Sequence, residues 1–218
     1  MPRHFLNIPS AQPGLTLEAI LDRPQGLGPF PAVVMCHPHP LHGGSMRNNV
    51  LYGVSQALEA AGIVSLRFNF RGVGSSSGTH TGGPGEEEDA RGALAFIAAA
   101  EGIDPARVGL AGYSFGARIA MAVASKHDRL AGLAVISSTS EGLAASGDLA
   151  TSLIPKFFIC GDRDTSVSVE ELREFVDRMP EPKELQVIPG ADHVWWRSEG
   201  ALGQAVARFF LKALDGGA

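Results

Sequence analysis

Short apolar runs alternate with longer amphipathic segments from Leu15 to the C-terminus. This alternation is typical of successive strand–helix–strand units, which build a mostly parallel central sheet with helices on both faces. Several runs are continuous in Val, Ile, Leu and Phe, as strands buried on both faces require. The predicted strands are Leu15–Leu21, Ala32–Cys36, Ile63–Phe70, Arg107–Ala111, Leu130–Ser137, Lys156–Cys160 and Glu184–Ile188. The pattern therefore predicts an α/β fold.

Amphipathic segments between these runs carry apolar residues at three- and four-residue steps, the spacing of a helix. The predicted helices are Asn48–Ala61, Glu86–Ala100, Phe115–Lys126, Val169–Met179 and Gly200–Leu214. The acidic run Glu86-Glu87-Glu88-Asp89 is expected to be a solvated helix start rather than a metal site, because negative charge stabilises a helix N-terminus. The polar, glycine-rich Ser75–Gly85 indicates a mobile loop. No linker separates two cores, so residues 1–218 are expected to form one domain.

Composition and charge narrow the partners. Hydrophobic residues make up 44% and charged residues 19%, which suits a globular core. The formal net charge is −5, the wrong sign for a surface that neutralises phosphates, so nucleic acid is not an expected partner. No apolar run approaches the roughly 20 residues that span a bilayer, and Met1–Asn7 lacks a signal-peptide core, so we expect a cytoplasmic protein with no membrane contact. Cys36 and Cys160 each end an apolar run and are expected to be buried thiols.

The segment Gly112-Tyr113-Ser114-Phe115-Gly116 has the form of a nucleophile elbow, in which small residues flank a serine on a tight strand-to-helix turn. It follows an apolar strand and precedes a helical pattern, which is the context that this turn requires. A second match, Gly74–Gly78, leads into residues that cannot begin a helix and is interpreted as a loop. Ser114 is therefore the candidate nucleophile.

A serine hydroxyl needs a base and a group that orients the base. His193 follows the last predicted strand and is expected at the carboxyl edge of the sheet, where ligands bind in α/β folds. Asp162 and Asp164 follow the preceding strand, and their spacing alone does not choose between them.

Acyl transfer also needs N–H donors for the oxyanion that develops on the substrate. One is expected from the amide of Phe115 and another from the loop His37–Gly44, which follows an earlier strand. Because the two prolines of that loop have no N–H, the candidates are His39 and, less favourably, Leu41.

With these motifs the chain resembles the α/β-hydrolase superfamily, and within it small bacterial serine hydrolases. The resemblance rests on His37–Met46, Asn69–Ser76, the elbow, Gly161–Asp164 and the late His193, in the order nucleophile, acid, base. It implies that Asp164, the last residue of a Gly-x-x-Asp pattern, is the acid, and that the His39 amide completes the oxyanion hole. It also places any lid between Ser138 and Pro155, an insert too short for a domain.

These features predict a capless serine esterase that cleaves small-molecule esters with short acyl chains through a Ser-His-Asp triad, with no cofactor or metal. The site is expected to be lined by Glu141–Leu153, Tyr113, Phe115, Trp195 and Trp196, although packing against the sheet edge is the favoured role of both tryptophans. A peptidase or amidase on the same triad and a non-catalytic binding protein on the same fold are the alternatives. A monomer and a homodimer both remain open.

Two other types of site have partial support in the sequence. His37, His39 and His42 have spacing that resembles the zinc ligands of metallo-β-lactamase-like hydrolases, but that pattern carries an aspartate where this chain has Leu41. Gly72–Gly78 is glycine-rich after a strand, but its spacing misses Gly-x-Gly-x-x-Gly and no helix follows, which disfavours nucleotide binding.

Overall fold

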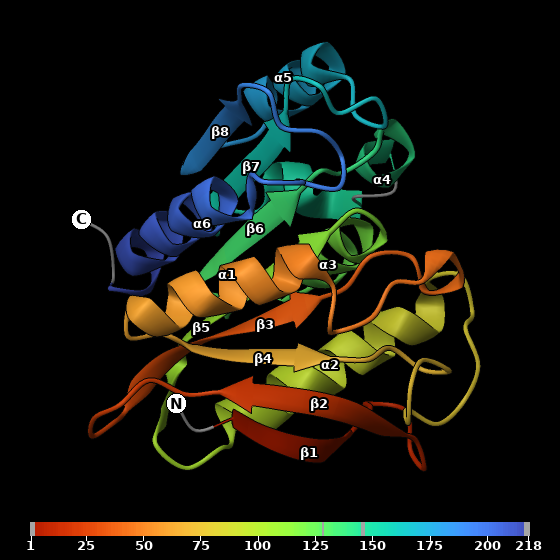
Figure 1. Ribbon diagram of the computed structural model, residues 1–218, viewed down its shortest axis with the longest axis vertical. Helices are drawn as coiled ribbons and strands as arrows, with labels where there is room; N and C mark the ends of the chain where they lie inside the picture. The colour runs from red at the N-terminus through yellow and green to blue at the C-terminus, as the bar shows by residue number, and fades with distance from the viewer. Residues whose placement is uncertain (1–2, 128, 145–146, 216–218) are drawn as a thin grey trace.

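The computed structural model describes residues 3–127, 129–144 and 147–215. Its described strands form one eight-stranded sheet in the order β1-β2-β4-β3-β5-β6-β7-β8 (Figure 1). All pairs from β4 to β8 are parallel, whereas β2 runs antiparallel to both β1 and β4. The strands are β1 (Arg3–Pro9), β2 (Thr16–Asp22), β3 (Phe30–Cys36), β4 (Val64–Phe68), β5 (Ile103–Tyr113), β6 (Gly132–Ile136), β7 (Lys156–Gly161) and β8 (Lys183–Ile188). The predicted mostly parallel α/β fold is confirmed.

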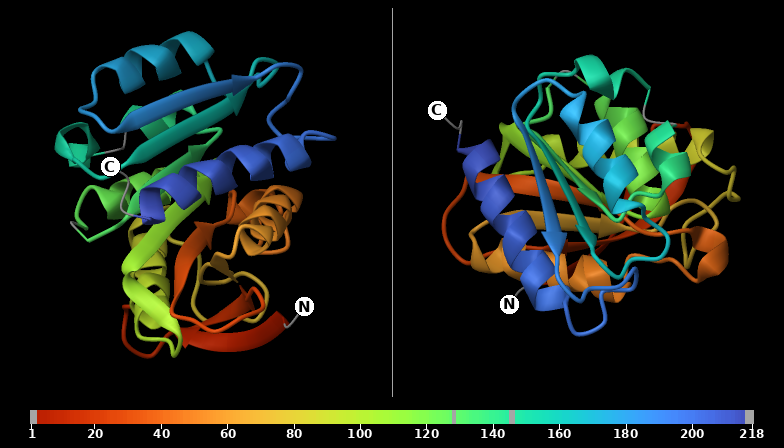
Figure 2. Two further views of the ribbon diagram at one scale, coloured as in Figure 1. Left: turned by 90° about the vertical axis from the view of Figure 1, so that its left-hand side faces the viewer. Right: turned by 90° about the horizontal axis from the view of Figure 1, so that it is seen from above.

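Helices cover both faces of this sheet (Figure 2). Buried residues of α1 and α6 form one apolar cluster, and those of α2, α3 and α5 form the cluster on the opposite face. The helices are α1 (Asn49–Ala60), α2 (Pro84–Ala98), α3 (Phe115–Ala124), α4 (Ser140–Ala144), α5 (Val169–Asp177) and α6 (Glu199–Leu214), with 3-10 turns at Pro40–His42 and Gly147–Thr151. Among these helices, none combines the length and apolar character that crossing a bilayer needs.

All predicted strands and helices are present with shifted ends, but the sequence pattern missed β1 and α4. β1 pairs along its whole length with β2, yet of its described side chains Ile8 alone is buried, so it gives almost no hydrophobic signal. α4 is a single short turn of helix in the predicted lid position. Cys36 and Cys160 are buried and free, as expected, and burial raises the pKa of the Cys160 thiol to about 11.

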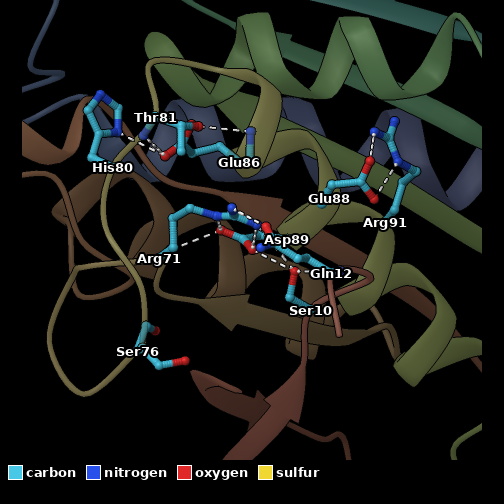
Figure 3. Close-up of polar contacts among 12 residues, drawn as sticks. Ser10, Gln12, Arg71, Ser76, His80, Thr81, Glu86, Glu88, Asp89 and Arg91 are labelled. Carbon is cyan, nitrogen blue, oxygen red and sulfur yellow. Dashed lines mark hydrogen bonds and ion pairs between the residues drawn. The ribbon is translucent and has the colours of Figure 1, made fainter. Parts of the chain in front are cut away.

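The expectation of a solvated acidic run is wrong for Glu86 and Asp89, which are fully buried. The Asp89 carboxylate accepts hydrogen bonds from Arg71 Nη2 (2.8 Å), Arg71 Nε (3.0 Å) and the Arg71 backbone N–H (2.9 Å), and also from Ser10 Oγ (Figure 3). The chain between β4 and α2 folds over the start of the helix and covers these acidic residues. The position of Glu86 and Asp89 at the start of a helix therefore gives no sign that their side chains are buried.

Glu86 closes the turn that precedes its own helix. Its carboxylate accepts from Thr81 N–H (2.9 Å), Thr81 Oγ1 (2.8 Å) and Gly83 N–H (2.7 Å), and His80 Nδ1 lies 3.0 Å away (Figure 3). Burial acts to raise the pKa of Glu86, but the hydrogen bonds from Thr81 and Gly83 outweigh it and lower that pKa. Ionised Glu86 thus fixes the backbone of the turn.

His37 joins the end of β3 to the end of β4. Its Nε2 accepts the Phe70 backbone N–H at 3.0 Å, so the neutral ring carries its proton on Nδ1, which donates to Pro38 O at 2.7 Å. The side chain is completely buried. Burial lowers the pKa of His37 to about 4.

We predict that Asp89→Asn lowers the free energy of unfolding by about 3–5 kcal/mol, because it leaves the buried Arg71 charge without its partner. Glu88→Gln is the matched control, since Glu88 is part of the same acidic run but its ion pair with Arg91 is partly exposed and worth only about 0–1 kcal/mol. Urea unfolding of the two variants measures both values, and equal losses would contradict the assigned role of Asp89.

Because His37 is buried in its neutral form, we predict that the free energy of unfolding falls in acid. The folded pKa of about 4 lies below the ordinary 6.5, so protonation favours the unfolded chain as the pH falls from 6.5 towards 4. At about pH 5 this linkage costs about 2 kcal/mol. Urea unfolding at about pH 7.5 and about pH 5 should show a smaller difference for His37→Asn than for the wild type. The exposed control His4→Asn should keep the wild-type difference, and an unchanged difference in His37→Asn would contradict the assignment.

Candidate active site

Ser114 lies on a strained turn between the end of β5 and the start of α3, with φ 55° and ψ −115°. The turn is tight enough to require glycine on either side. A Cβ at Gly112 would lie 2.1 Å from the carbonyl oxygen of Gly116, and a Cβ at Gly116 would lie 2.2 Å from that of Cys36. Any larger residue would push α3 away from the sheet, so the glycine pattern has a direct steric cause.

The structure brings Ser114, His193 and Asp164 together at the carboxyl edge of the sheet. His193 Nε2 lies 3.2 Å from Ser114 Oγ, and His193 Nδ1 lies 2.9 and 3.0 Å from the two carboxylate oxygens of Asp164. Asp164 is 5% exposed and also accepts the Ser166 backbone N–H at 2.9 Å. A carboxylate at Nδ1 favours the tautomer with its proton there, which leaves Nε2 free to accept the serine proton.

Asp162, the other acid weighed from the sequence, does not contact the histidine ring. It is exposed, and its Oδ1 accepts the backbone N–H of Gly190 at 2.6 Å. Asp162 therefore holds the turn that follows β8, and the turn leads towards His193.

Two buried aromatic residues pack beneath the loop that carries His193. Tyr113 is almost fully buried, and its hydroxyl donates to the carbonyl oxygen of His193 at 2.6 Å. Trp195 is completely buried, and its Nε1 donates to Ser137 Oγ at 3.0 Å. Trp196 is 69% exposed. The expectation that these three residues line the site is wrong, because none of them borders the cavity over Ser114, whereas the favoured packing role holds for Trp195.

The cavity over Ser114 has a volume of about 410 Å³, towards the small end of ligand sites. Of the predicted lining segment, Glu141 and Gly142 border it, and residues 145 and 146 lie outside the described part of the chain. The lining residues are His39, His42, Ser114, Phe115, Arg118, Thr139, Glu141, Gly142, Ser166 and His193.

Both residues expected to supply oxyanion donors, His39 and Phe115, border this cavity, and their rings lie 4.8 Å apart. Among the described residues, neither backbone N–H has a hydrogen-bond acceptor. The alternative Leu41 amide is already used, because it donates to His39 Nδ1 at 3.2 Å. This leaves the His39 amide as the candidate from that loop.

The three histidines weighed as zinc ligands do not form a ligand set. Both ring nitrogens of His37 are occupied by backbone groups, and the His39 and His42 rings stack at 4.5 Å. Within the described ranges, no group of three His, Cys, Asp or Glu side chains is placed to hold a metal.

This chain is similar in sequence to a known protein family and to bacterial proteins. A family model described as X-Pro dipeptidyl-peptidase (S15 family) matches residues 14–150, more than half of the chain. The uncharacterized protein RP471 of Rickettsia prowazekii is 34% identical over 188 residues, which are 83% of this chain and 79% of that protein.

Solved structures point the same way. An alpha-beta serine hydrolase homologue from Coxiella burnetii is 33% identical with a TM-score of 0.83, covering 95% of this chain and 97% of the other. XC6422 from Xanthomonas campestris, described as an a/b serine hydrolase without lid, is 27% identical with a TM-score of 0.83, covering 98% and 97%. The superfamily resemblance found in the sequence is confirmed: the chain belongs to the family described as X-Pro dipeptidyl-peptidase (S15 family) and, with it, to the α/β-hydrolase superfamily.

Proposed function

We propose that this hydrolase cleaves small carboxylic esters with short acyl chains through an acyl-enzyme on Ser114. The observation that carries the proposal is the hydrogen-bonded series Asp164, His193, Ser114, with the serine held on the strained turn after β5. A nucleophile, a base in reach of it and a carboxylate that orients the base are the parts that acyl transfer requires.

In the proposed mechanism His193 moves a proton between Ser114, the leaving alcohol and water. Ser114 Oγ attacks the ester carbonyl carbon while His193 Nε2 takes the hydroxyl proton, and Asp164 stabilises the imidazolium that forms. The tetrahedral intermediate then breaks its bond to the alcohol oxygen, which receives the proton from His193. A water molecule, deprotonated by His193, attacks the acyl-enzyme, and Ser114 leaves with the returned proton.

The negative charge that develops on the carbonyl oxygen needs fixed donors, and we assign these to the backbone amides of Phe115 and His39. Phe115 begins α3, so its N–H lies at the positive end of the helix dipole. Donors set in advance do not reorganise during the reaction, and each contributes about 3–4 kcal/mol to stabilising the transition state.

The cavity favours a short acyl group. Its volume of about 410 Å³ and its polar walls, which include Thr139, Glu141 and Ser166, suit a small substrate better than a long alkyl chain. The family description favours peptide hydrolysis as a second candidate function. An amide has a poorer leaving group and needs more binding surface to offset this, so we place the ester first.

We predict that the wild-type protein hydrolyses p-nitrophenyl acetate and butyrate with higher kcat/KM than the palmitate ester. Ser114→Ala should lose at least about a thousandfold in kcat, because it removes the nucleophile. A fluorophosphonate probe should label Ser114, as peptide mass mapping would show. Ser75→Ala, an exposed serine of the second Gly-x-Ser-x-Gly match, is the matched control and should keep full activity.

These assays, together with hydrolysis of an X-Pro p-nitroanilide, separate the alternatives. Higher kcat/KM on palmitate would contradict the short acyl preference. Turnover of an X-Pro p-nitroanilide without ester turnover would favour the peptidase, and no reaction of Ser114 with the probe would favour a binding protein.

Asp164→Asn is predicted to lower kcat by roughly 10³–10⁴-fold with the fold retained, because an amide at this position favours the wrong tautomer of His193. Asp162→Asn is the control, since its carboxylate holds only the Gly190 turn, and it should retain most of the activity. Steady-state kinetics on the butyrate ester, with circular dichroism for folding, measure both. A larger loss in Asp162→Asn would show that the acid is misassigned.

A further inference from the structure

Arg118 is a permanent cation in the wall of the cavity over Ser114, and the proposed ester mechanism gives it no role. It lies on α3, one helical turn after the serine. Long side chains on a helix lean towards its N-terminus, and the guanidinium carbon of Arg118 accordingly lies 4.8 Å from the centre of the Phe115 ring. The charge is therefore carried back towards the end of the helix where Ser114 lies.

The guanidinium is also held from its other side. Its Nη2 donates to the carbonyl oxygen of Gly82 at 2.7 Å, and a Cβ at Gly83 would lie 3.1 Å from Nη1. Arg118 is thus packed between the Phe115 ring and the backbone of the Gly82-Gly83 turn. Stacking on an aromatic ring and a hydrogen bond to a carbonyl both leave the positive charge in place.

The turn that holds Arg118 is itself fixed by a buried charge. Glu86 accepts hydrogen bonds from the backbone N–H groups of Thr81 and Gly83, on either side of Gly82 (Figure 3). The Gly82 carbonyl is therefore set in position before any ligand arrives. A head group arranged in this way loses little conformational entropy when it binds an anion.

No described carboxylate forms an ion pair with Arg118, and its hydrogen bond to Gly82 uses one of several N–H groups. Two acidic residues lie nearby. Glu86 is fully buried, and its carboxylate oxygens accept hydrogen bonds from its own turn. Glu141 borders the same cavity but does not pair with the guanidinium. A cation that is built into a site and left without a counter-charge is suited to an anionic part of the substrate.

We propose that Arg118 forms a carboxylate subsite, and that the substrate is a half-ester of a short dicarboxylic acid whose free carboxylate binds this guanidinium. This inference rests on the proposed esterase function and specifies its substrate class. Four residues of helix separate the backbones of Ser114 and Arg118 by about 6 Å along the axis, and the Arg118 side chain leans back towards the serine, so a short dicarboxylic acid suits the two groups.

The His39 side chain, on the same wall, is compatible with a bound anion. Burial, together with the charges of His42, His80 and Arg118, lowers the pKa of His39, so this ring is neutral at pH 7. Its Nδ1 already accepts the Leu41 N–H, which places the ring proton on Nε2. His39 thus adds an N–H donor and no negative charge to this wall.

The test compares p-nitrophenyl esters that share a leaving group and differ in the charge at the far end of the acyl chain. These are the half-ester of adipic acid, the same compound capped as its methyl ester, and p-nitrophenyl 6-aminohexanoate. For the wild type we expect kcat/KM to be about tenfold higher for the half-ester than for the capped ester, mainly through a lower KM. This preference should weaken as NaCl is raised, since salt screens a partly exposed ion pair.

Variants assign the preference to Arg118. In Arg118→Gln the ratio between the half-ester and the capped ester should fall to about one, and Arg118→Lys should give an intermediate ratio because it keeps the charge but loses the planar fork. Arg208→Gln is the control for net charge, since Arg208 is exposed on α6 across the sheet, and it should keep the wild-type ratio.

Several outcomes would overturn the subsite. A wild-type ratio of about one, an unchanged ratio in Arg118→Gln, or a preference for the aminohexanoate, which would point to Glu141, each contradicts it. Turnover of the capped ester without a charge preference removes the subsite and leaves the esterase standing. No turnover of any ester, in wild type and variants alike, removes the esterase proposal and the subsite with it.

Discussion

The close approach between the first turn of α3 and the end of β3 is the contact on which the rest of the site depends. Gly116 lies so near the carbonyl oxygens of Cys36 and His37 that a Cβ would come within 2.2 and 2.6 Å of them. Two residues before this contact, Ser114 adopts the positive φ of the tight strand-to-helix turn. The same approach of α3 to the end of β3 places the His39 ring beside Phe115, so the serine and both candidate amides lie around one packing contact.

Buried polar groups hold the loops around the site in position. His37 ties its loop to the end of β4, Glu86 closes the turn before α2, and Asp89 holds Arg71. A buried charge with a full set of partners adds little net stability, but breaking such a set is costly. These groups therefore act mainly by excluding other loop conformations. The loop of His37 carries His39 and His42, which border the cavity, and the turn closed by Glu86 holds Arg118, which borders it too.

The alternation of apolar runs was enough to predict the strands that are buried on both faces, and the strand–turn–helix context was enough to choose Ser114 over the serines of Gly74–Gly78. The pattern could not reveal β1, which buries Ile8 and little else, or the burial of Glu86 and Asp89. Spacing also left Asp162 and Asp164 equivalent, because the direction of a side chain in a loop depends on contacts with distant segments. The contact with His193 distinguishes them only in three dimensions.

The glycine-rich segment between β4 and α2 shows how such contacts replace local signals. The sequence indicates a mobile loop over Ser75–Gly85 and disfavours a phosphate loop at Gly72–Gly78. In the structure Gly72, Gly74 and Gly78 adopt positive φ and turn the chain back onto β2. Ser76 Oγ accepts the Glu18 N–H, and Ser77 N–H donates to Thr16 O, so the segment is hydrogen-bonded to the start of β2. The chain that leads into the turn at Gly82 is therefore held in place. A connection that reads as flexible is thus held at β2 by residues that lie far from it in the sequence, and its far end holds the Arg118 side chain that borders the cavity.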